Sequence, residues 1–432
     1  MKQILRTALV LTFFITSLKG QSGSINNTLG SGGTFTVKDG STTFLTLSQT
    51  DGYLTLGKNL ALSGTTSSTT GVVTKNGSSF IHDYHPSGAT GFNTFLGILS
   101  GNFTMSGTST QASYNTAVGA SSLAFLTTGN TNSAFGYSSL FSTATGTANC
   151  AFGYKSLTSN DAGSENCAMG YEALRDNTSS DNCAFGYQAL NKNTSGSNNC
   201  GFGFVSLNAN VSGNSNSAFG AWSLANNTGS SNTGFGYSAG SNITSGSNNT
   251  CIGYNAQPSS ATVSNQITLG DGSISSLRCN TTSISSLSDA RDKKNIKDLS
   301  LGIDFLMSIR PRQFNWDRRE WYADRKPDGS KIQETPTAGF ISQELDEAQT
   351  GAHAEWLNLV LKNNPDRLEA TPGNLLPIMV KAIQDLKTEN DALKNELIAL
   401  RSSLAEEVKK EVKEILLKAV QAEEQATKVS LK

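Results

Sequence analysis

Asn182-Cys183-Ala184-Phe185-Gly186 is one copy of a five-residue pattern that recurs through the middle of this 432-residue chain. The closing glycine returns every 16 or 17 residues, and an asparagine stands four residues before it in nine of ten copies. A fixed period of about 20 residues is typical of a solenoid, whose units bury their apolar faces only by stacking. The glycines are Gly119, Gly136, Gly153, Gly170, Gly186, Gly203, Gly220, Gly236, Gly253 and Gly270.

We therefore expect one coil per repeat in a mainly β fibre. The short strand of each coil should place the small Ala184 and the large Phe185 on opposite sides. The glycine should supply the backbone freedom that a corner needs, and the stacked asparagines should hydrogen-bond along the rod as a ladder. A leucine also follows the glycine by four residues in seven repeats, from Leu123 to Leu224.

The repeat unit Asn-x-Ala-x-Gly resembles the repeats in the heads of trimeric autotransporter adhesins. That resemblance implies a left-handed β-roll built from three chains, and residues 101–280 are predicted to form it. The repeat here is slightly longer than in those heads, which leaves the handedness and the corner geometry open.

Four cysteines occupy one position of the repeat, three residues before the glycine. They are Cys150, Cys167, Cys183 and Cys200, and serine or threonine takes the same place in other repeats. This exchange favours structural thiols over a disulfide framework, which a secreted protein could also form. Metal-binding spacing of the CxxC type is absent, so neither a metal nor a cofactor is predicted.

The start of the chain predicts secretion. Residues 1–20 combine Lys2 and Arg6 with an apolar run over residues 7–18, which is typical of a signal peptide. The run is shorter than the roughly 20 residues that a membrane helix needs, and no later segment could span a bilayer. A buried N-terminal strand is the alternative. A net charge of −1 makes nucleic acid an unexpected partner.

Residues 21–100 are rich in glycine, serine and threonine and are predicted to form a β-rich N-terminal fibre section. Alternating residues over 34–37 and 44–47 indicate two short strands, which turn signals separate. His82 and His85 stand three residues apart without a third ligand nearby. We expect two surface histidines in a loop here.

The composition changes at Ser288-Asp289-Ala290-Arg291-Asp292-Lys293-Lys294-Asn295-Ile296. Ser-Asp before an amphipathic segment is a common helix N-cap. The same stretch also places a serine hydroxyl five residues before a lysine. A lysine amine acts as a general base only in its neutral form, which burial or a neighbouring cation favours. Residues five apart share no helix face, so tertiary structure must bring them together.

The wider context resembles a known family. Its members carry a C-terminal intramolecular chaperone autoprocessing domain, found on phage endosialidase tailspikes and tail fibres. The resemblance implies a trimeric chaperone that helps the upstream fibre fold and then cuts itself off before the motif serine. By position it implies Ser288 as nucleophile, Lys293 as base, Leu287–Ser288 as the scissile bond, and Asp289, Arg291 and Asn295 as supporting residues. The matching residues are 288–296, 302–304, 310–311, 314–316, 339–345 and 374–386.

Residues 285–375 are predicted to form this small α/β domain, with a strand at Phe340-Ile341 and a helix over 342–348. Residues 376–432 are predicted to form a coiled coil. Its apolar positions alternate in steps of four and three, with Asn390 in the one polar slot, where a buried asparagine can fix register. A single surface helix is the alternative. The seam is Met379, Ile383, Leu386, Leu393, Leu397, Leu400 and Leu404.

The favoured function is a secreted or surface homotrimeric fibre, adhesin-like or tail-fibre-like, with a self-cleaving Ser-Lys chaperone domain. Its ligand is an unknown surface or glycan. One alternative is a structural fibre that keeps its trimerisation domain. A glycan-degrading tailspike is a weaker alternative, because glycosidases use two carboxylates in a cleft. The stretch 101–280 has six scattered acids without an obvious pair.

Overall fold

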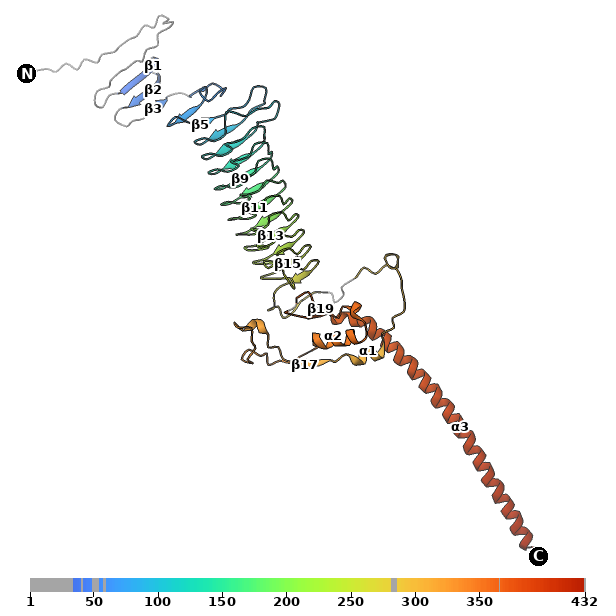
Figure 1. Ribbon diagram of the computed structural model, residues 1–432. Coiled ribbons are helices and arrows are strands. Elements are labelled where there is room, and N and C mark those ends of the chain that lie inside the picture. The colour runs from blue at the N-terminus through green and yellow to red at the C-terminus, as the bar shows by residue number, and fades with distance from the viewer. Residues whose placement is uncertain are drawn as a thin grey trace, which may run out of the picture.

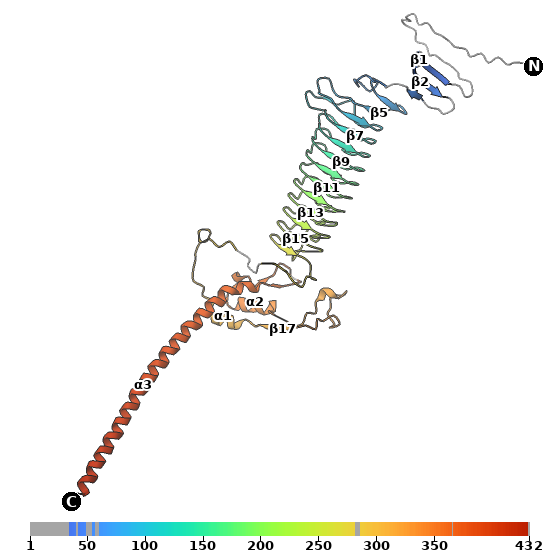
Figure 2. The same cartoon turned by 180° about the vertical axis from the view of Figure 1, so that it is seen from behind.

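The computed structural model describes residues 34–39, 42–48, 54–56, 60–280, 286–364 and 366–430. The chain forms a long β-solenoid, a small mixed α/β region at its C-terminal end, and one helix that projects away from both (Figures 1 and 2). The predicted signal peptide lies outside the described residues. Within them, no helix has the length and apolarity to cross a bilayer.

Two antiparallel arrangements precede the solenoid. A three-stranded sheet joins β1 (Thr34–Asp39), β2 (Thr42–Ser48) and β3 (Leu54–Leu56), which confirms strands at both predicted places. The hairpin β4 (Val73–Lys75) and β5 (Ser78–His82) then lies antiparallel on the first solenoid strand. This hairpin covers the N-terminal edge of the stack.

The solenoid is a stack of short parallel strands, one for each coil. Each strand pairs in register with the next, so that Cys167 lies beside Cys150 and Cys183. The parallel strands run from the hairpin to an open edge at the last strand. They are β6 (Thr94–Leu96), β7 (Thr116–Val118), β8 (Ser133–Phe135), β9 (Cys150–Phe152), β10 (Cys167–Met169), β11 (Cys183–Phe185), β12 (Cys200–Phe202), β13 (Ser217–Phe219), β14 (Thr233–Phe235), β15 (Thr250–Ile252) and β16 (Ile267–Leu269).

The predicted division of side chains is confirmed. The central alanine of the strands is fully buried, as at Ala151 and Ala184, and so are the leucines that follow the glycines by four residues, from Leu123 to Leu224. The aromatic residue that follows the central position of the strand lies on the outside, where Phe185 and Phe202 stack with ring centroids 4.8 Å apart. The coil therefore has an aliphatic interior and an aromatic outer row.

The predicted asparagine ladder is also present. Asn199 Nδ2 donates to Asn182 Oδ1 at 3.2 Å and to the Gly213 carbonyl at 2.8 Å, while its backbone NH reaches the same Asn182 oxygen at 3.0 Å. The neighbouring turns repeat these bonds. Such pairing satisfies buried amides that would otherwise destabilise the coil. A second buried column was not predicted, and it consists of Asn160, Asn177, Asn193, Asn210 and Asn227.

The repeat glycine is required for two reasons. Its φ angle is positive, for example +133° at Gly136, which side-chain-bearing residues rarely adopt. A Cβ at Gly136 would also lie 2.4 Å from the carbonyl oxygen of Gly153 in the next turn. The turns stack too closely at this corner for any side chain.

The region after the solenoid has its own core, which includes Phe305, Leu345, Leu359 and Ile378. Its sheets are small and antiparallel. The predicted helix over 342–348 is present and longer, whereas the predicted strand at Phe340-Ile341 is wrong: the strand ends at Gly339, and Ile341 precedes the helix. The elements are α1 (Ile303–Ser308), β17 (Arg312–Phe314), β18 (Thr337–Gly339), α2 (Ser342–Gly351), β19 (Val360–Leu361) and β20 (Glu369–Ala370).

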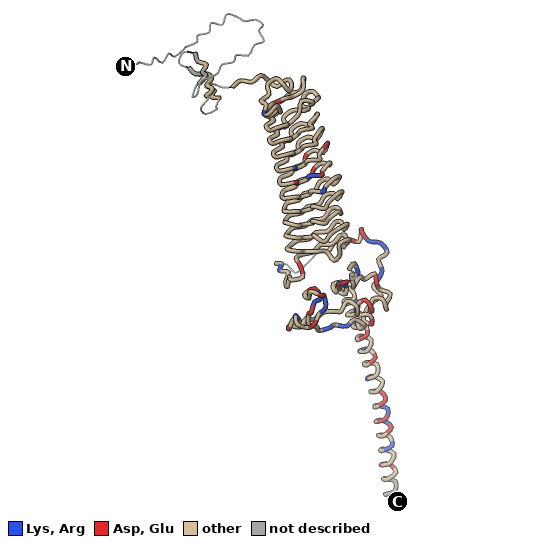
Figure 3. The backbone as a smooth tube through the Cα atoms, turned by 60° about the vertical axis from the view of Figure 1, so that its left-hand side comes forward, with Lys and Arg blue, Asp and Glu red and all other residues tan. Residues whose placement is uncertain are grey.

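The last element is α3 (Leu376–Ser430), a helix of 55 residues. Its first turns pack on α1, and the rest extends away from the body (Figure 1). At 1.5 Å per residue it is about 82 Å long. Charges are dense on this helix and in the α/β region but sparse on the solenoid (Figure 3).

Candidate functional site

The segment between solenoid and α/β core carries the Ser–Lys motif on an exposed surface. Leu287 is fully exposed, and Ser288 is exposed beside it. A single 3₁₀ turn, η1 (Ala290–Asp292), follows. The N-cap of this turn is Asp289, whose carboxylate accepts a hydrogen bond from the Arg291 backbone NH at 2.8 Å. The capping interpretation of Ser-Asp thus holds for the aspartate, while the serine lies outside the turn.

The turn brings Lys293 back to Ser288. Lys293 Nζ donates to Ser288 Oγ and, at 3.3 Å, to the Ser288 carbonyl oxygen. The chain leaves the turn extended at Lys293, with φ −122° and ψ 144°. A continuous helix would hold these side chains apart, so the short turn is what brings them together.

Asp289 stabilises this turn through two contacts with Arg291. Its carboxylate caps the backbone and also forms a bidentate ion pair with the Arg291 guanidinium, with Nη2 to Oδ2 at 2.6 Å. The Arg291 side chain, and then its backbone NH, hold the pKa of Asp289 below its usual value. Asn295 adopts a left-handed conformation with φ +54°, which asparagine tolerates better than most residues.

The sequence around this turn matches a known protein family. Residues 288–353 match the family described as chaperone of endosialidase, also named peptidase S74. The match begins at Ser288 and ends just after α2, so the α/β region behind the solenoid contains a chaperone domain of this kind. Comparison with curated proteins and with solved structures gave no significant match. The adhesin-head likeness of the repeats stays a prediction.

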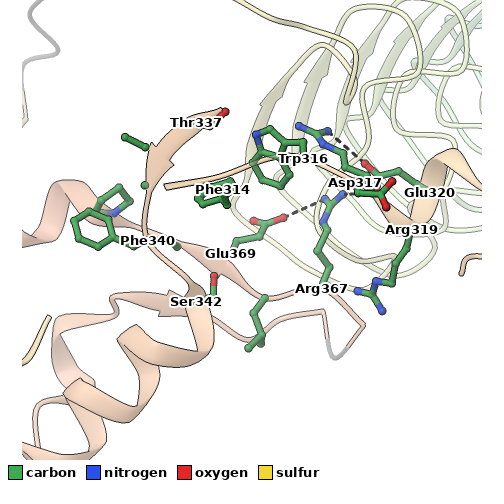
Figure 4. A pocket seen from close by; sticks show the side chains of 16 residues that line it. Phe314, Trp316, Asp317, Arg319, Glu320, Thr337, Phe340, Ser342, Arg367 and Glu369 are labelled. Atoms are coloured by element: carbon green, nitrogen blue, oxygen red, sulfur yellow. Dashed lines mark hydrogen bonds and ion pairs between the residues drawn. The ribbon is translucent and has the colours of Figure 1, made fainter. Parts of the chain in front are cut away.

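We call the α/β region from Ser288 to the start of α3 the chaperone region. A cleft of about 770 Å³ lies in it, away from the Ser–Lys motif. Figure 4 shows Phe314, Trp316, Glu320, Arg367 and Glu369 around it. Its lining combines aromatic rings with ion pairs, including Arg367 to Glu369 at 3.1 Å. The cleft is formed without Ser288 or Lys293, so the Ser–Lys motif and this cleft are separate features.

The cysteines are free thiols. Those of the repeat form one row on adjacent strands, half buried, as expected for structural thiols. Burial raises the pKa of the separate Cys251 thiol to about 11. Within the described residues, no cluster of three histidine, cysteine or acidic side chains could hold a metal ion.

Two other sequence-based expectations concern polar side chains. Among the acids of the solenoid, Glu172 and Asp176 both form ion pairs with Arg175, at 3.3 and 2.8 Å, so these two carboxylates share one cation on the surface of the coil. The expectation of two surface histidines is wrong for His82. Its ring is only 5% exposed and contacts the ring of Phe95, because it ends β5 and faces the first turn of the solenoid.

Two residues at the junction were missed by sequence analysis. Arg318 Nη1 donates to the Gly272 carbonyl at 3.1 Å, and Asn364 Nδ2 donates to the Ser259 carbonyl at 2.8 Å. Each contact joins the chaperone region to the last turn of the solenoid across many residues of sequence. No local sequence pattern indicates such a pair, because the acceptor in each bond is a backbone carbonyl oxygen, which every residue has.

Proposed function

We propose that this chain is a secreted or surface homotrimeric fibre whose C-terminal domain assists folding and then cuts itself off at Leu287–Ser288. The single observation that carries the proposal is the contact between Lys293 Nζ and Ser288 Oγ directly after an exposed peptide bond. The family match supports the chaperone and peptidase assignment. The ligand of the fibre is an unidentified surface or glycan.

The reaction follows from the placement of these atoms. A neutral Lys293 amine takes the proton of the Ser288 hydroxyl, and Oγ attacks the Leu287 carbonyl carbon. The peptide C–N bond breaks as the Lys293 ammonium returns its proton to the Ser288 nitrogen, which leaves as an amine, and an ester joins Leu287 to Oγ. Water then hydrolyses that ester, which leaves the Leu287 carboxylate and the free hydroxyl. The domain acts once, on its own chain.

The terminal helix supports a trimer. Its seam faces solvent in a single chain: Leu393 and Leu400 are 63% and 68% exposed. A helix of this length with an apolar heptad seam is stabilised by copies of itself. Sequestering the seam therefore requires further chains, and the family resemblance makes three the expected number.

The outer face of the solenoid also fits identical partners. Tyr154, Tyr171 and Tyr187 stack along the rod at 5.0 and 5.2 Å, so they occupy each other's faces and present ring edges outward. Carbohydrate sites generally offer a ring face to the sugar, which this row does not. A second copy of the chain has the same spacing between the rings of its own row, so the two rows can pack against each other turn by turn.

Assembly also offers a way to activate the motif. An amine exposed to water retains its proton near neutral pH, whereas excluding water favours the neutral amine. In the single chain Ser288 and Lys293 are exposed. We expect neighbouring copies to cover them, so that cutting follows assembly rather than preceding it.

The test is the size and N-terminus of the products. The wild-type chain should yield a fragment of residues 288–432 that begins at Ser288. Ser288→Ala removes the attacking oxygen and Lys293→Ala removes the base, so both variants should remain full length, because such losses cost orders of magnitude in rate. Denaturing electrophoresis and N-terminal sequencing measure both results.

Lys294→Ala is the matched control, since it removes the adjacent lysine and should cut at a rate near wild type. A fragment with another N-terminus, or normal cutting in Ser288→Ala, contradicts the assigned bond. A chain that stays uncut but trimeric under all conditions would instead favour the structural fibre that retains its trimerisation domain.

A further inference from the structure

The last turn of the solenoid ends in an open strand edge. β16 is the terminal strand of the parallel sheet, and the described residues after it form no further turn of the solenoid. Exposed strand edges carry unpaired backbone groups that invite non-native pairing, and repeat proteins need a cap at such ends. The carbonyl of Gly272, just after β16, has a side-chain partner that comes from outside the solenoid.

Gly272 stands two residues after the last repeat glycine. At this position of three earlier turns, the backbone carbonyl accepts a hydrogen bond from a side-chain amide of the following turn. Glu172 accepts from Asn191 and Gln188 from Asn208, each at 3.0 Å, and Ser238 accepts from Gln257 at 2.7 Å. In the last turn the donor is Arg318 of the chaperone region, at 3.1 Å.

We infer that Arg318 acts as a surrogate next turn, through which the chaperone region docks on the open end of the solenoid. A second contact, from Asn364 to the Ser259 carbonyl, lies on the same terminal turn. The partner of this surface is therefore the final coil, residues 259–272, of the fibre itself. The inference rests on the proposed chaperone function and names the part of the fibre on which the domain acts.

The chaperone region is built to hold Arg318 in this position. Its guanidinium lies over the Trp316 ring, 4.6 Å from the centroid, and 5.7 Å from that of Trp321. Glu320 pairs with it at 3.4 Å. Trp316 and Glu320 lie beside the cleft of Figure 4, with the solenoid turns behind them. A guanidinium held by ring faces and a carboxylate loses little freedom when it binds a carbonyl.

Gly272 is matched to this contact from the solenoid side. A Cβ at Gly272 would lie 3.2 Å from Arg318 Nη1 and 3.5 Å from Glu320 Oε1. The first distance is tight, so a side chain here would push the guanidinium from its place. The absence of a side chain thus permits the close approach of the two parts.

The experiment compares full-length Ser288→Ala chains that also carry Arg318→Ala, Asn364→Ala or Arg325→Ala, by hydrogen exchange and light scattering. Arg325→Ala is the control, because it removes an exposed arginine of the same segment. We expect exchange in residues 252–272 to be roughly tenfold faster in the Arg318 and Asn364 variants, as loss of a hydrogen bond from a charged group or of a partly buried one predicts. Exchange in β10 and β11 should not change.

Exchange in α2 separates docking from folding of the domain. If Arg318→Ala also loosens α2, the comparison rests on Asn364→Ala, which leaves the Trp316 and Glu320 cluster intact. Unchanged exchange over 252–272 in a variant with normal α2 overturns the inference. Failure of the proposed function has a different signature: the Ser288→Ala parent would itself scatter light as a single chain.

Discussion

At the scale of single residues, the motif depends on a turn of three residues. Ser288 and Lys293 meet because η1 reverses the chain, and Asp289 stabilises η1 by capping its backbone and binding Arg291. In the proposed reaction, Asp289 and Arg291 would thus act by holding the turn, and not by contact with the bond that is cut. We regard Asp289 as a positioning residue for the proposed reaction.

Substitutions of Asp289 separate its two contacts. Asp289→Ala removes both the cap and the ion pair, so cutting should slow by roughly a hundredfold, as misplaced reacting groups typically do. Asp289→Asn keeps an acceptor for the Arg291 NH and should retain much of the rate. Time courses of cutting on denaturing gels measure both. Equal loss in the two variants would indicate that the charge matters rather than the cap.

At the scale of elements, the repeat made the solenoid predictable, because glycine, asparagine and leucine each recur at fixed spacing. The backbone conformation of the repeat leucines could not be predicted from the sequence. Leu123, Leu157 and Leu190 adopt left-handed φ angles near +50°, although leucine has no local preference for that conformation. Stacking on the next turn imposes it. Contacts between distant segments, such as Arg318 with Gly272, have no local signal either.

The hairpin β4–β5 gives an element-scale prediction on pH. Burial lowers the pKa of His82 below its ordinary 6.5, and a hydrogen bond from its ring to the Ser100 carbonyl and the nearby Asp83 oppose this only in part. Between the folded and unfolded pKa values the unfolded chain binds more protons. The contribution of a neutral His82 to the free energy of unfolding is therefore fully present above pH 6.5. It is lost as the pH falls toward the folded-state pKa, by about 1.4 kcal/mol for each unit between the two pKa values.

Hydrogen exchange of β5 at pH 7.5 and 5.5, corrected for intrinsic rates, measures this effect. Protection should decrease at the lower pH in the wild type, and His82→Gln should remove the dependence. His85→Gln is the control and should preserve it. Asp83 does not confuse the result, because a bond from Thr65 holds its pKa below 3.8, outside this pH range. A wild-type hairpin with identical protection at both pH values would contradict the assignment to His82.

At the scale of the whole molecule, antiparallel or α/β structure contacts both ends of the solenoid, while its outer aromatic rows and most of α3 face solvent. The hairpin covers β6 and the chaperone region contacts the last turn. The aromatic rows run along the solenoid and the helical seam runs along α3, both on exposed or half-buried surface. Exposed aromatic rows on the solenoid and an exposed apolar seam on α3 are suited to lateral association of identical chains.

The seam of α3 provides the matched test of that association. Leu397→Lys places a charge in the seam, whereas Asn395→Lys adds the same charge to the opposite face of the helix. In a Ser288→Ala background, the parent and Asn395→Lys should scatter light with three times the mass of one chain, as measured for that chain under denaturing conditions. Leu397→Lys should weaken the trimer by at least about 3 kcal/mol per chain, because it removes a buried leucine and gathers three ammonium groups. A parent of single-chain mass, or equal masses for both lysine variants at every concentration, would show that the helix does not join the chains.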